Sequence, residues 1–359
     1  MKKYFIFAVA ALAASVACTK TNIDTDQLPD QKITFDVVKY VPQTRADNSS
    51  LRAEGYEKFT TYAWAHNGSE SDGQPYMNKE VVEYNSTDKV WAPTSHVYYW
   101  PKNSYINFFS YAGVAHTPDF TVSENSMKLE DAVIAADDNI LVADASYGYS
   151  ANASGTYGFD DVTQGVPVLF HHMLAKVIVN VKVDATDITD TKYNWKVDID
   201  KANVTLSYRD KGTLEVAFTP ETTAQTKSWD TATWTVADIA NINCPSDKLN
   251  TISVNADGGS ESAPATLVSE TVVLPQTLAD TGVTIAFTYT LTSTYDGGST
   301  ITEVVPVTAT ALSTTSVPAW AMNTIYTYTI VIKPNAAPVL FDPAVSPWTD
   351  GATTTVTID

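Results

Sequence analysis

Residues 283–291 read VTIAFTYTL, and this stretch decides the fold class. Apolar residues alternate there with threonine or alanine, which is the period of a β-strand that buries one face. The residues expected to face a core are Val283, Ile285, Phe287, Tyr289 and Leu291. Residues 296–298 then read DGG, which accepts the positive φ of a tight turn. We therefore expect an antiparallel hairpin that returns through residues 301–309, and Pro306 indicates that the returning strand lies at a sheet edge.

The same two-residue period recurs in residues 177–183 and 326–332, where valine, tyrosine and isoleucine occupy every second position. Threonine, valine and tyrosine are abundant throughout, and no long segment has the apolar spacing of an amphipathic helix. Short strands separated by turns such as Asp257-Gly258 favour sandwiches over a parallel sheet with crossover helices. The expected fold class is all-β, with two tandem transthyretin-like or immunoglobulin-like β-sandwich domains.

The length of 359 residues is natural for about two domains. A polar, threonine-rich passage at residues 220–230 is the best candidate boundary. The sequence thus predicts an N-terminal domain over residues 33–225 and a C-terminal domain over residues 226–359. Residues 18–32 are polar and are expected to form a tether.

Residues 1–17 have the layout of a secretory signal, with Lys2 and Lys3 followed by an apolar run. Ala17 stands directly before Cys18, as in lipoprotein signals, where the cysteine becomes the acylated first residue. Cys18 is therefore the predicted lipidation site, and it would anchor the precursor in the outer membrane. The alternative is an ordinary signal peptide that is cut nearby.

The composition argues against nucleic acid and against most enzymes. The formal net charge of −19 would repel phosphate. None of the five histidines has metal-ligand spacing, and no nucleophile or phosphate-binding motif is present. Carboxylate pairs such as Asp137-Asp138 lie in expected loops, which leaves an anchored hydrolase as a minor alternative. We predict no catalytic residue, no metal site and no cofactor.

Eight tryptophans and nineteen tyrosines support a more serious alternative, a monomeric surface lipoprotein that binds glycans. Such a protein would expose its aromatic side chains in a row. Residues 98–101 and 105–111 instead have strand-like alternation, in which aromatic side chains ordinarily fill a sandwich core.

Several segments together resemble the fimbrillin family, and specifically the minor-fimbrillin-like pilus subunits of Bacteroides-type bacteria. The resemblance covers nearly the whole chain beyond the signal and rests on a pattern of segments, not on one motif. Those segments are residues 33–35 (ITF), 44–46 (TRA), 99–101 (YWP), 106–111 (INFFSY), 168–177 (VLFHHMLAKV), 273–275 (VLP), 320–330 and 345–348.

The resemblance implies two transthyretin-like domains, export as a lipoprotein and a place in a cell-surface fimbrium that supports adhesion. It also implies cleavage between Arg45 and Ala46, which would remove a first strand at residues 33–38 and open a groove. Arg52 offers a second arginine site.

A strand from another subunit would fill that groove, so subunits would polymerise by donor-strand exchange. The resemblance assigns the donor role to residues 339–359, and the strand-like residues there are Val339, Leu340, Phe341, Val356 and Ile358. The alternative is that these residues pair within their own C-terminal domain. The implied partners are other fimbrial subunits, alike or different, and a host or bacterial surface receptor for the assembled fibre.

Overall fold

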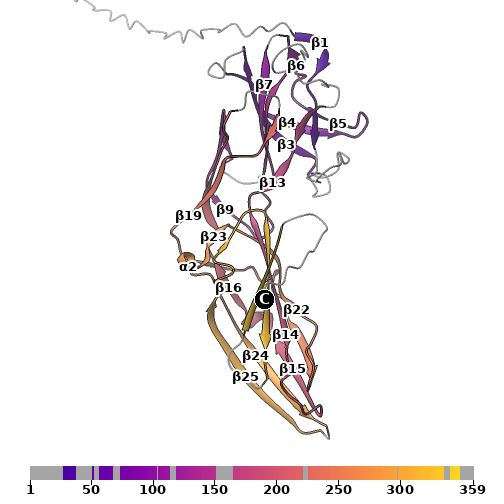
Figure 1. The fold of residues 1–359 in the computed structure, drawn as a ribbon, viewed down its shortest axis with the longest axis vertical. Coiled ribbons are helices and arrows are strands. Elements are labelled where there is room, and N and C mark those ends of the chain that lie inside the picture. Colours follow the sequence, from indigo (N-terminus) through magenta and orange to yellow (C-terminus); the bar gives the residue numbers. More distant parts are fainter. Residues whose placement is uncertain are drawn as a thin grey trace, which may run out of the picture.

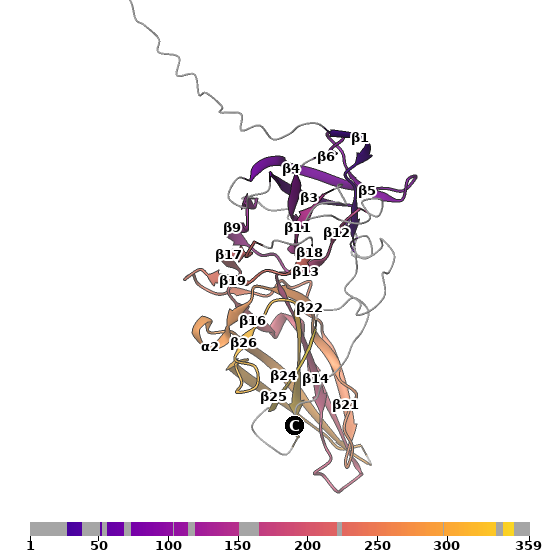
Figure 2. The ribbon, with the colours of Figure 1, turned by 45° about the horizontal axis from the view of Figure 1, so that its top comes forward.

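The computed structural model describes residues 27–37, 51, 56–67, 73–102, 104–113, 119–150, 165–220, 225–296, 298–334 and 340–347. The described chain is built almost wholly of β-strands, which confirms the all-β class (Figure 1). The N-terminal strands lie at one end of an elongated molecule and the long C-terminal strands at the other (Figures 1 and 2). Helix α2 (Leu278–Thr281) and the 3-10 helix η3 (Lys201–Asn203) are each a single short turn. Within the described ranges, no helix is long and apolar enough to cross a membrane.

The N-terminal end contains a ten-stranded sheet. Its main path is β12 (Val166–Val168), β2 (Phe35–Val37), β5 (Val90–Pro93), β4 (Gln74–Asn85), β3 (Lys58–His66), β7 (Tyr105–Ala112), β10 (Leu141–Ala143) and β13 (Phe170–His172). The remaining two strands are β11 (Ala145–Tyr149), which pairs with β7, and β18 (Gln225–Lys227), which pairs with β11. A four-stranded sheet has the order β19 (Thr231–Val236), β17 (Lys211–Ala217), β9 (Ser126–Val133) and β8 (Thr121–Ser123). A separate pair joins β1 (Gln27–Lys32) to β6 (Tyr99–Pro101).

The C-terminal end is formed mainly by two facing sheets. One has the order β22 (Ala265–Val273), β14 (Ala175–Val183), β27 (Thr324–Ile332) and β28 (Leu340–Pro347). The other has the order β20 (Ile242–Asn243), β16 (Thr205–Tyr208), β24 (Thr284–Tyr295), β15 (Tyr193–Ile199) and β21 (Ile252–Asp257), with β25 (Thr300–Ala311) on β24. A short pair joins β23 (Gln276–Thr277) to β26 (Ala319–Trp320).

The antiparallel hairpin predicted for residues 283–309 is confirmed. β24 buries alternate residues from Ile285 to Leu291, and β25 pairs with it antiparallel. Gly298 has a φ of 98°, which glycine adopts without strain, so it supports the turn between the two strands. Within the described chain β25 pairs only with β24, so Pro306 lies in an edge strand as expected.

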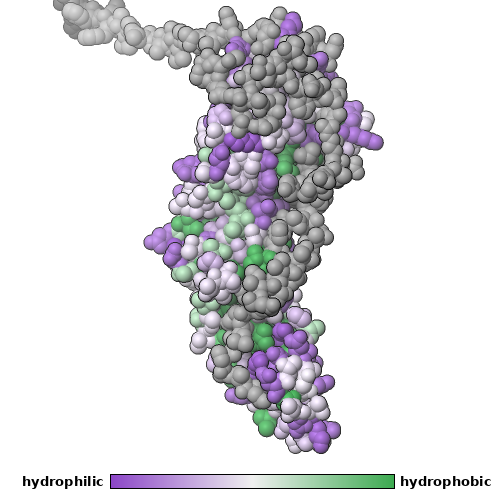
Figure 3. Space-filling model, viewed as in Figure 1, coloured by the Kyte–Doolittle hydropathy of each residue, from purple (hydrophilic) through white to green (hydrophobic). Residues whose placement is uncertain are grey.

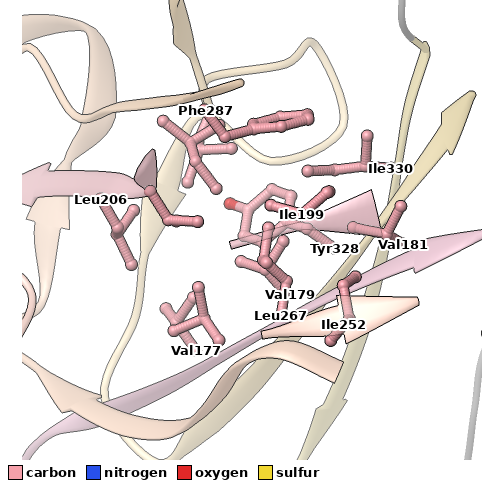
Figure 4. Close-up of a cluster of buried hydrophobic side chains, with 14 of the residues drawn as sticks. Val177, Val179, Val181, Ile199, Leu206, Ile252, Leu267, Phe287, Tyr328 and Ile330 are labelled. Atoms are coloured by element: carbon pink, nitrogen blue, oxygen red, sulfur yellow. The ribbon is translucent and has the colours of Figure 1, made fainter. Parts of the chain in front are cut away.

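The C-terminal core lies between the two facing sheets (Figure 4). Alternate residues of β14 from Val177 to Val183 are fully buried and meet side chains of β24 and β27 such as Phe287, Tyr328 and Ile330. β14 pairs antiparallel with β22 but parallel with β27. The sandwich prediction therefore holds, although this central strand pair is parallel without a crossover helix.

The ten-stranded sheet is covered on both faces, and β7 shows this best because all eight of its residues are buried. Ile106 and Phe108 belong to one apolar cluster with Phe59 and Trp91. Phe109 and Tyr111 belong to another cluster, shared with strands of the β19-β17-β9-β8 sheet. A strand with two buried faces loses the simple alternation that a one-sided strand shows.

The expected boundary between residues 225 and 226 does not separate the sheets. β14 and β15 precede it, yet they pair with β22, β27, β21 and β24, which follow it. In the other direction, β19 follows the boundary and pairs with β17, which precedes it. The continuous hydrogen-bond ladders, and not the polar passage at 220–230, therefore decide which residues fold together.

Candidate functional site

The segment implied to be removed, residues 33–38, supplies β2, an interior strand of the ten-stranded sheet. On one side Phe35 and Val37 pair parallel with Val166 and Val168 of β12, and on the other side Phe35 pairs antiparallel with Trp91 of β5. The neighbouring backbone adds two hydrogen bonds of 2.8 Å, from Ile33 N to Tyr98 O and from Val166 N to Thr34 O. This short segment is thus bonded along both of its edges.

The side chains of this segment fill the centre of an aromatic core. Ile33, Phe35 and Val37 are each 2% exposed or less. The Phe35 ring meets the rings of Phe59 and Phe108 edge-on, with centroids 5.5 and 5.4 Å away. Burial of a side chain of this size contributes about 1.5–3 kcal/mol. Loss of the segment would therefore leave a deep apolar groove lined by aromatic rings.

Gly165 makes room for the segment. Its φ is 83°, and a Cβ added there would lie 2.8 Å from the carbonyl carbon of Phe35. Only glycine combines this backbone conformation with such a close approach. The glycine directly before β12 therefore allows the chain to lie against the backbone of β2.

Two buried indole groups border the same core without full hydrogen bonding. The Nε1 atoms of Trp91 and Trp100 have no hydrogen-bond partner in the described part of the chain. A buried donor without a partner costs about 1–3 kcal/mol. The region around β2 therefore buries much apolar surface but leaves two buried indole N–H groups without a described hydrogen-bond partner.

The expected donor tail is partly described, and the described part pairs within its own chain. Residues 340–347 form β28, which pairs antiparallel with β27 from Val331↔Leu340 to Thr324↔Pro347. This pairing agrees with the alternative left open by the sequence, in which the tail completes its own domain. Among the described strands, β28 is the last of its sheet and is bonded along one edge only.

The other predicted site residues lie outside the described residues. These are Cys18, Arg45, Ala46, Arg52, Val339, Val356 and Ile358. Leu340 and Phe341 belong to β28, where the structure places their backbone. Lipidation, cleavage and strand donation therefore stay predictions.

The histidines take part in polar contacts between strands. His171 Nε2 lies 2.9 Å from Asp144 Oδ1, and His172 Nδ1 lies 2.8 Å from Asn139 Oδ1. Among the described residues, no three His, Cys, Asp or Glu side chains are grouped so that they could hold a metal ion. These contacts give His171 and His172 a structural role.

Sequence reasoning missed a buried polar cluster around His66. His66 Nε2 lies 2.5 Å from Glu124 Oε1, and the Asn107 amide nitrogen lies 3.2 Å from the same imidazole nitrogen. The Tyr105 ring stacks on the imidazole at 4.8 Å. These residues connect β3 and β7 to the turn between β8 and β9. No local motif reveals the cluster, because His66 and Glu124 are 58 positions apart.

The aromatic side chains are mostly core residues. Trp91, Trp100, Trp320 and many tyrosines and phenylalanines are almost fully buried. The large exposed hydrophobic residues of the described chain are Val97, Val133, Ile239, Tyr295, Ile301 and Val304, a set without tryptophan. An exposed aromatic row of the kind that the glycan-binding alternative requires is therefore not observed in the described part.

Comparison with protein families identifies the chain. A family model described as fimbrillin-like matches residues 44–348. The chain belongs to the fimbrillin-like family. The resemblance read from the separate segments is thereby confirmed, and the buried β2 strand just described belongs to a fimbrillin-like protein. No curated protein matches this fimbrillin-like chain by sequence.

Solved structures of similar proteins come from Bacteroides species. A fimbrial protein from Bacteroides vulgatus is 16% identical, with a TM-score of 0.55 over 88% of the fimbrillin-like chain and 99% of its own. A proposed cell adhesion protein from Bacteroides uniformis is 17% identical, with a TM-score of 0.42 over 90% and 100% of the two chains. The first similarity shows a shared fold for the fimbrillin-like chain.

Proposed function

We propose that this protein is a structural subunit of a cell-surface fimbria that polymerises by donor-strand exchange. The precursor is exported as a lipoprotein acylated at Cys18 and is held at the outer membrane. Cleavage between Arg45 and Ala46 then removes the segment that contains β2. A strand from the tail of a neighbouring subunit, residues 339–359, takes its place, and adhesion is a property of the assembled fibre.

The observation that carries this proposal is the position of β2 between β12 and β5. Removal of an edge strand leaves one unpaired edge, whereas removal of β2 leaves two edges that face each other across an apolar groove. An incoming strand would bond to both edges and bury its side chains in the space of Ile33, Phe35 and Val37.

The position of β28 supports the donor role of the tail. Within the described ranges it pairs only with β27 and ends one side of its sheet, so fewer backbone bonds hold it than hold an interior strand. Its departure would leave β27 paired with β14 and the C-terminal core still enclosed by the other strands. Transfer of the tail is therefore compatible with an intact C-terminal sandwich.

The test is limited digestion of residues 19–359 with an arginine-specific protease at native pH. We expect a new N-terminus at Ala46, loss of the residue 33–38 segment from the folded product, and SDS-resistant ladders. Arg45→Ala should abolish both cleavage and ladders, whereas the matched variant Arg52→Ala should preserve both. A cleaved product that stays monomeric would contradict strand exchange and favour the monomeric glycan-binding alternative.

A further inference from the structure

A second groove lies where the two ends of the molecule meet, far along the chain from β2. It has a volume of about 470 Å³ and is lined by residues of β19, β23, β26 and α2. Its apolar walls include Trp234 and Val236 on one side and Trp320 and Met322 on the other. Hydrophobic surface is visible among polar surface at mid-height of the molecule, in the region of β19 and β23 (Figure 3).

The groove runs along a free sheet edge. In the described chain β19 pairs with β17 only. In an antiparallel pair, every second residue directs its backbone N–H and C=O toward the partner strand. Ala237 is one of these residues, because its N–H donates to Lys211 O at 2.8 Å. The backbone groups of Val236, Trp234 and Ala232 therefore face away from β17. All three residues line the groove, so an extended segment lying in it could bond to them as a new strand.

The described chain ends beside this groove. Pro347, the last residue of β28, pairs with Thr324 at the start of β27. Thr324 Oγ1 in turn donates to the carbonyl oxygen of Met322, a groove residue, at 2.9 Å. The sequence continues through residues 348–359, which lie outside the described residues. Residues 348–351, when extended, span up to about 14 Å.

The sequence of that continuation suits the groove. Residues 352–358 read ATTTVTI, an uncharged stretch rich in β-branched residues. In a strand, Thr354, Val356 and Ile358 share one face, and the other face carries Thr353, Thr355 and Thr357. The charged residues that line the groove are Arg209 and Asp280, of opposite sign. Arg209 is already held by Asp238 at 3.2 Å. An uncharged strand with one apolar face therefore matches both the walls and the charge of the groove.

We propose that residues 352–358 add as a strand to the free edge of β19 in the same chain. Val356 and Ile358 then cover the groove between Trp234 and Trp320, and the threonines of the other face lie beside exposed Thr233. This inference goes beyond the proposed strand exchange, because it concerns the unassembled subunit and holds even if the tail never leaves its own chain. The end of the tail would then be bound to its own chain, and it would have to be released before transfer to another subunit.

Disulfide trapping tests the position directly. We would use residues 19–359 with Cys244→Ala, a chain that covers every described position and carries no cysteine. Thr233→Cys is combined in turn with Thr353→Cys, Thr355→Cys and Thr357→Cys, and the protein is oxidised at low concentration. We expect one pair to lose both free thiols within the monomer, as seen by non-reducing gel mobility and by mass spectrometry of linked peptides.

The matched control moves the strand cysteine to Thr308→Cys, on the exposed and unpaired edge of β25. We expect this position to keep its free thiols with all three tail cysteines. Trapping at Thr308 instead of Thr233, trapping at neither, or disulfides only between molecules would each overturn the proposal. The last result would assign the groove to the tail of a second copy.

A truncation supplies an independent readout. A chain that ends at Trp348 keeps β28 but lacks the docking strand, so Trp234 should become more accessible to acrylamide quenching. A peptide of residues 349–359 should reverse this change, and a peptide with Val356→Asp and Ile358→Asp should not. Unchanged quenching after truncation would contradict the proposal whatever the fate of the Arg45 cleavage, so the failures of the two proposals are distinguishable.

Discussion

The two ends of the molecule achieve burial in different ways. The C-terminal sandwich uses long strands such as β14 and β24, which alternate buried and outward residues over most of their length. The N-terminal sheet contains three-residue strands such as β2 and β12, and its core depends on aromatic rings that meet edge-on. In long ladders each buried residue packs in a continuous core, so the loss of one side chain is costly. Short strands around an aromatic core permit one segment to be replaced by another of similar pattern.

The largest effect is expected in the C-terminal core. Phe287→Ala removes a ring that is 2% exposed, between the two sheets. It should lower the free energy of unfolding by about 3–5 kcal/mol, because a cavity remains in the core. Urea denaturation followed by circular dichroism measures this change. Thr302→Ala, on the exposed edge strand, should stay within about 0.5 kcal/mol of the parent.

A smaller and more local effect is expected at Gly165→Ala. The new methyl group would press on the backbone of Phe35 and force alanine to a φ of 83°, at a cost of about 1–3 kcal/mol. Hydrogen exchange should accelerate in β2 and β12 while β14 and β24 keep their protection. Gly298→Ala is the control, since its φ is 98° but nothing lies within 4 Å. Equal effects of both variants on β2 would refute the fit between Gly165 and β2.

The indoles of the two regions provide a sharper comparison. Trp320 Nε1 donates to the Tyr328 hydroxyl at 3.0 Å, whereas Trp100 Nε1 has no partner within the described ranges. Both changes to phenylalanine remove similar volume. Trp320→Phe should therefore be more destabilising than Trp100→Phe by at least about 1 kcal/mol, because the first change loses a hydrogen bond and the second removes an unpaired buried donor. A larger loss for Trp100→Phe in thermal unfolding would show that its N–H is satisfied in solution.

The smallest effect concerns Asp119, at the N-terminal end. Burial favours a higher pKa for this carboxyl, but hydrogen bonds from Lys79 and Tyr111 outweigh it and hold the pKa below 3.8. A depressed carboxyl pKa contributes stability above the unfolded value, and this contribution is lost as the pH falls through the folded value. Asp119→Asn should cost less than about 1 kcal/mol at neutral pH, since the pair is partly exposed. The difference from the parent should vanish in unfolding curves well below pH 3.8.

Sequence reasoning predicted most where a strand buries one face only. β14, β24 and β27 follow directly from their alternation, and Pro306 correctly indicated an edge. Alternation does not say which strand lies next to which, so the parallel pairing of β14 with β27 was not predictable. The sheets that cross residue 225 were missed for the same reason.

At the candidate site, the sequence indicated the segment but not its surroundings. The alternation of Ile33, Phe35 and Val37 marks a strand, yet nothing in it shows that β12 and β5 lie on its two sides. The approach of Gly165 to Phe35 joins positions far apart in the chain, as does the contact of His66 with Glu124. Such pairs are decided by packing, which a single sequence does not encode locally.

The parallel register of β14 and β27 imposes an order on folding. Ala175 pairs with Thr324, so β14 waits for a partner that lies about 150 residues further along the chain. A polypeptide that emerges from a membrane N-terminus first would leave one edge of β14 unpaired until almost all of the chain had been translocated. The sheet that contains this valine-rich strand would then be completed late, and until that point the strand edge would stay open to contacts with other chains.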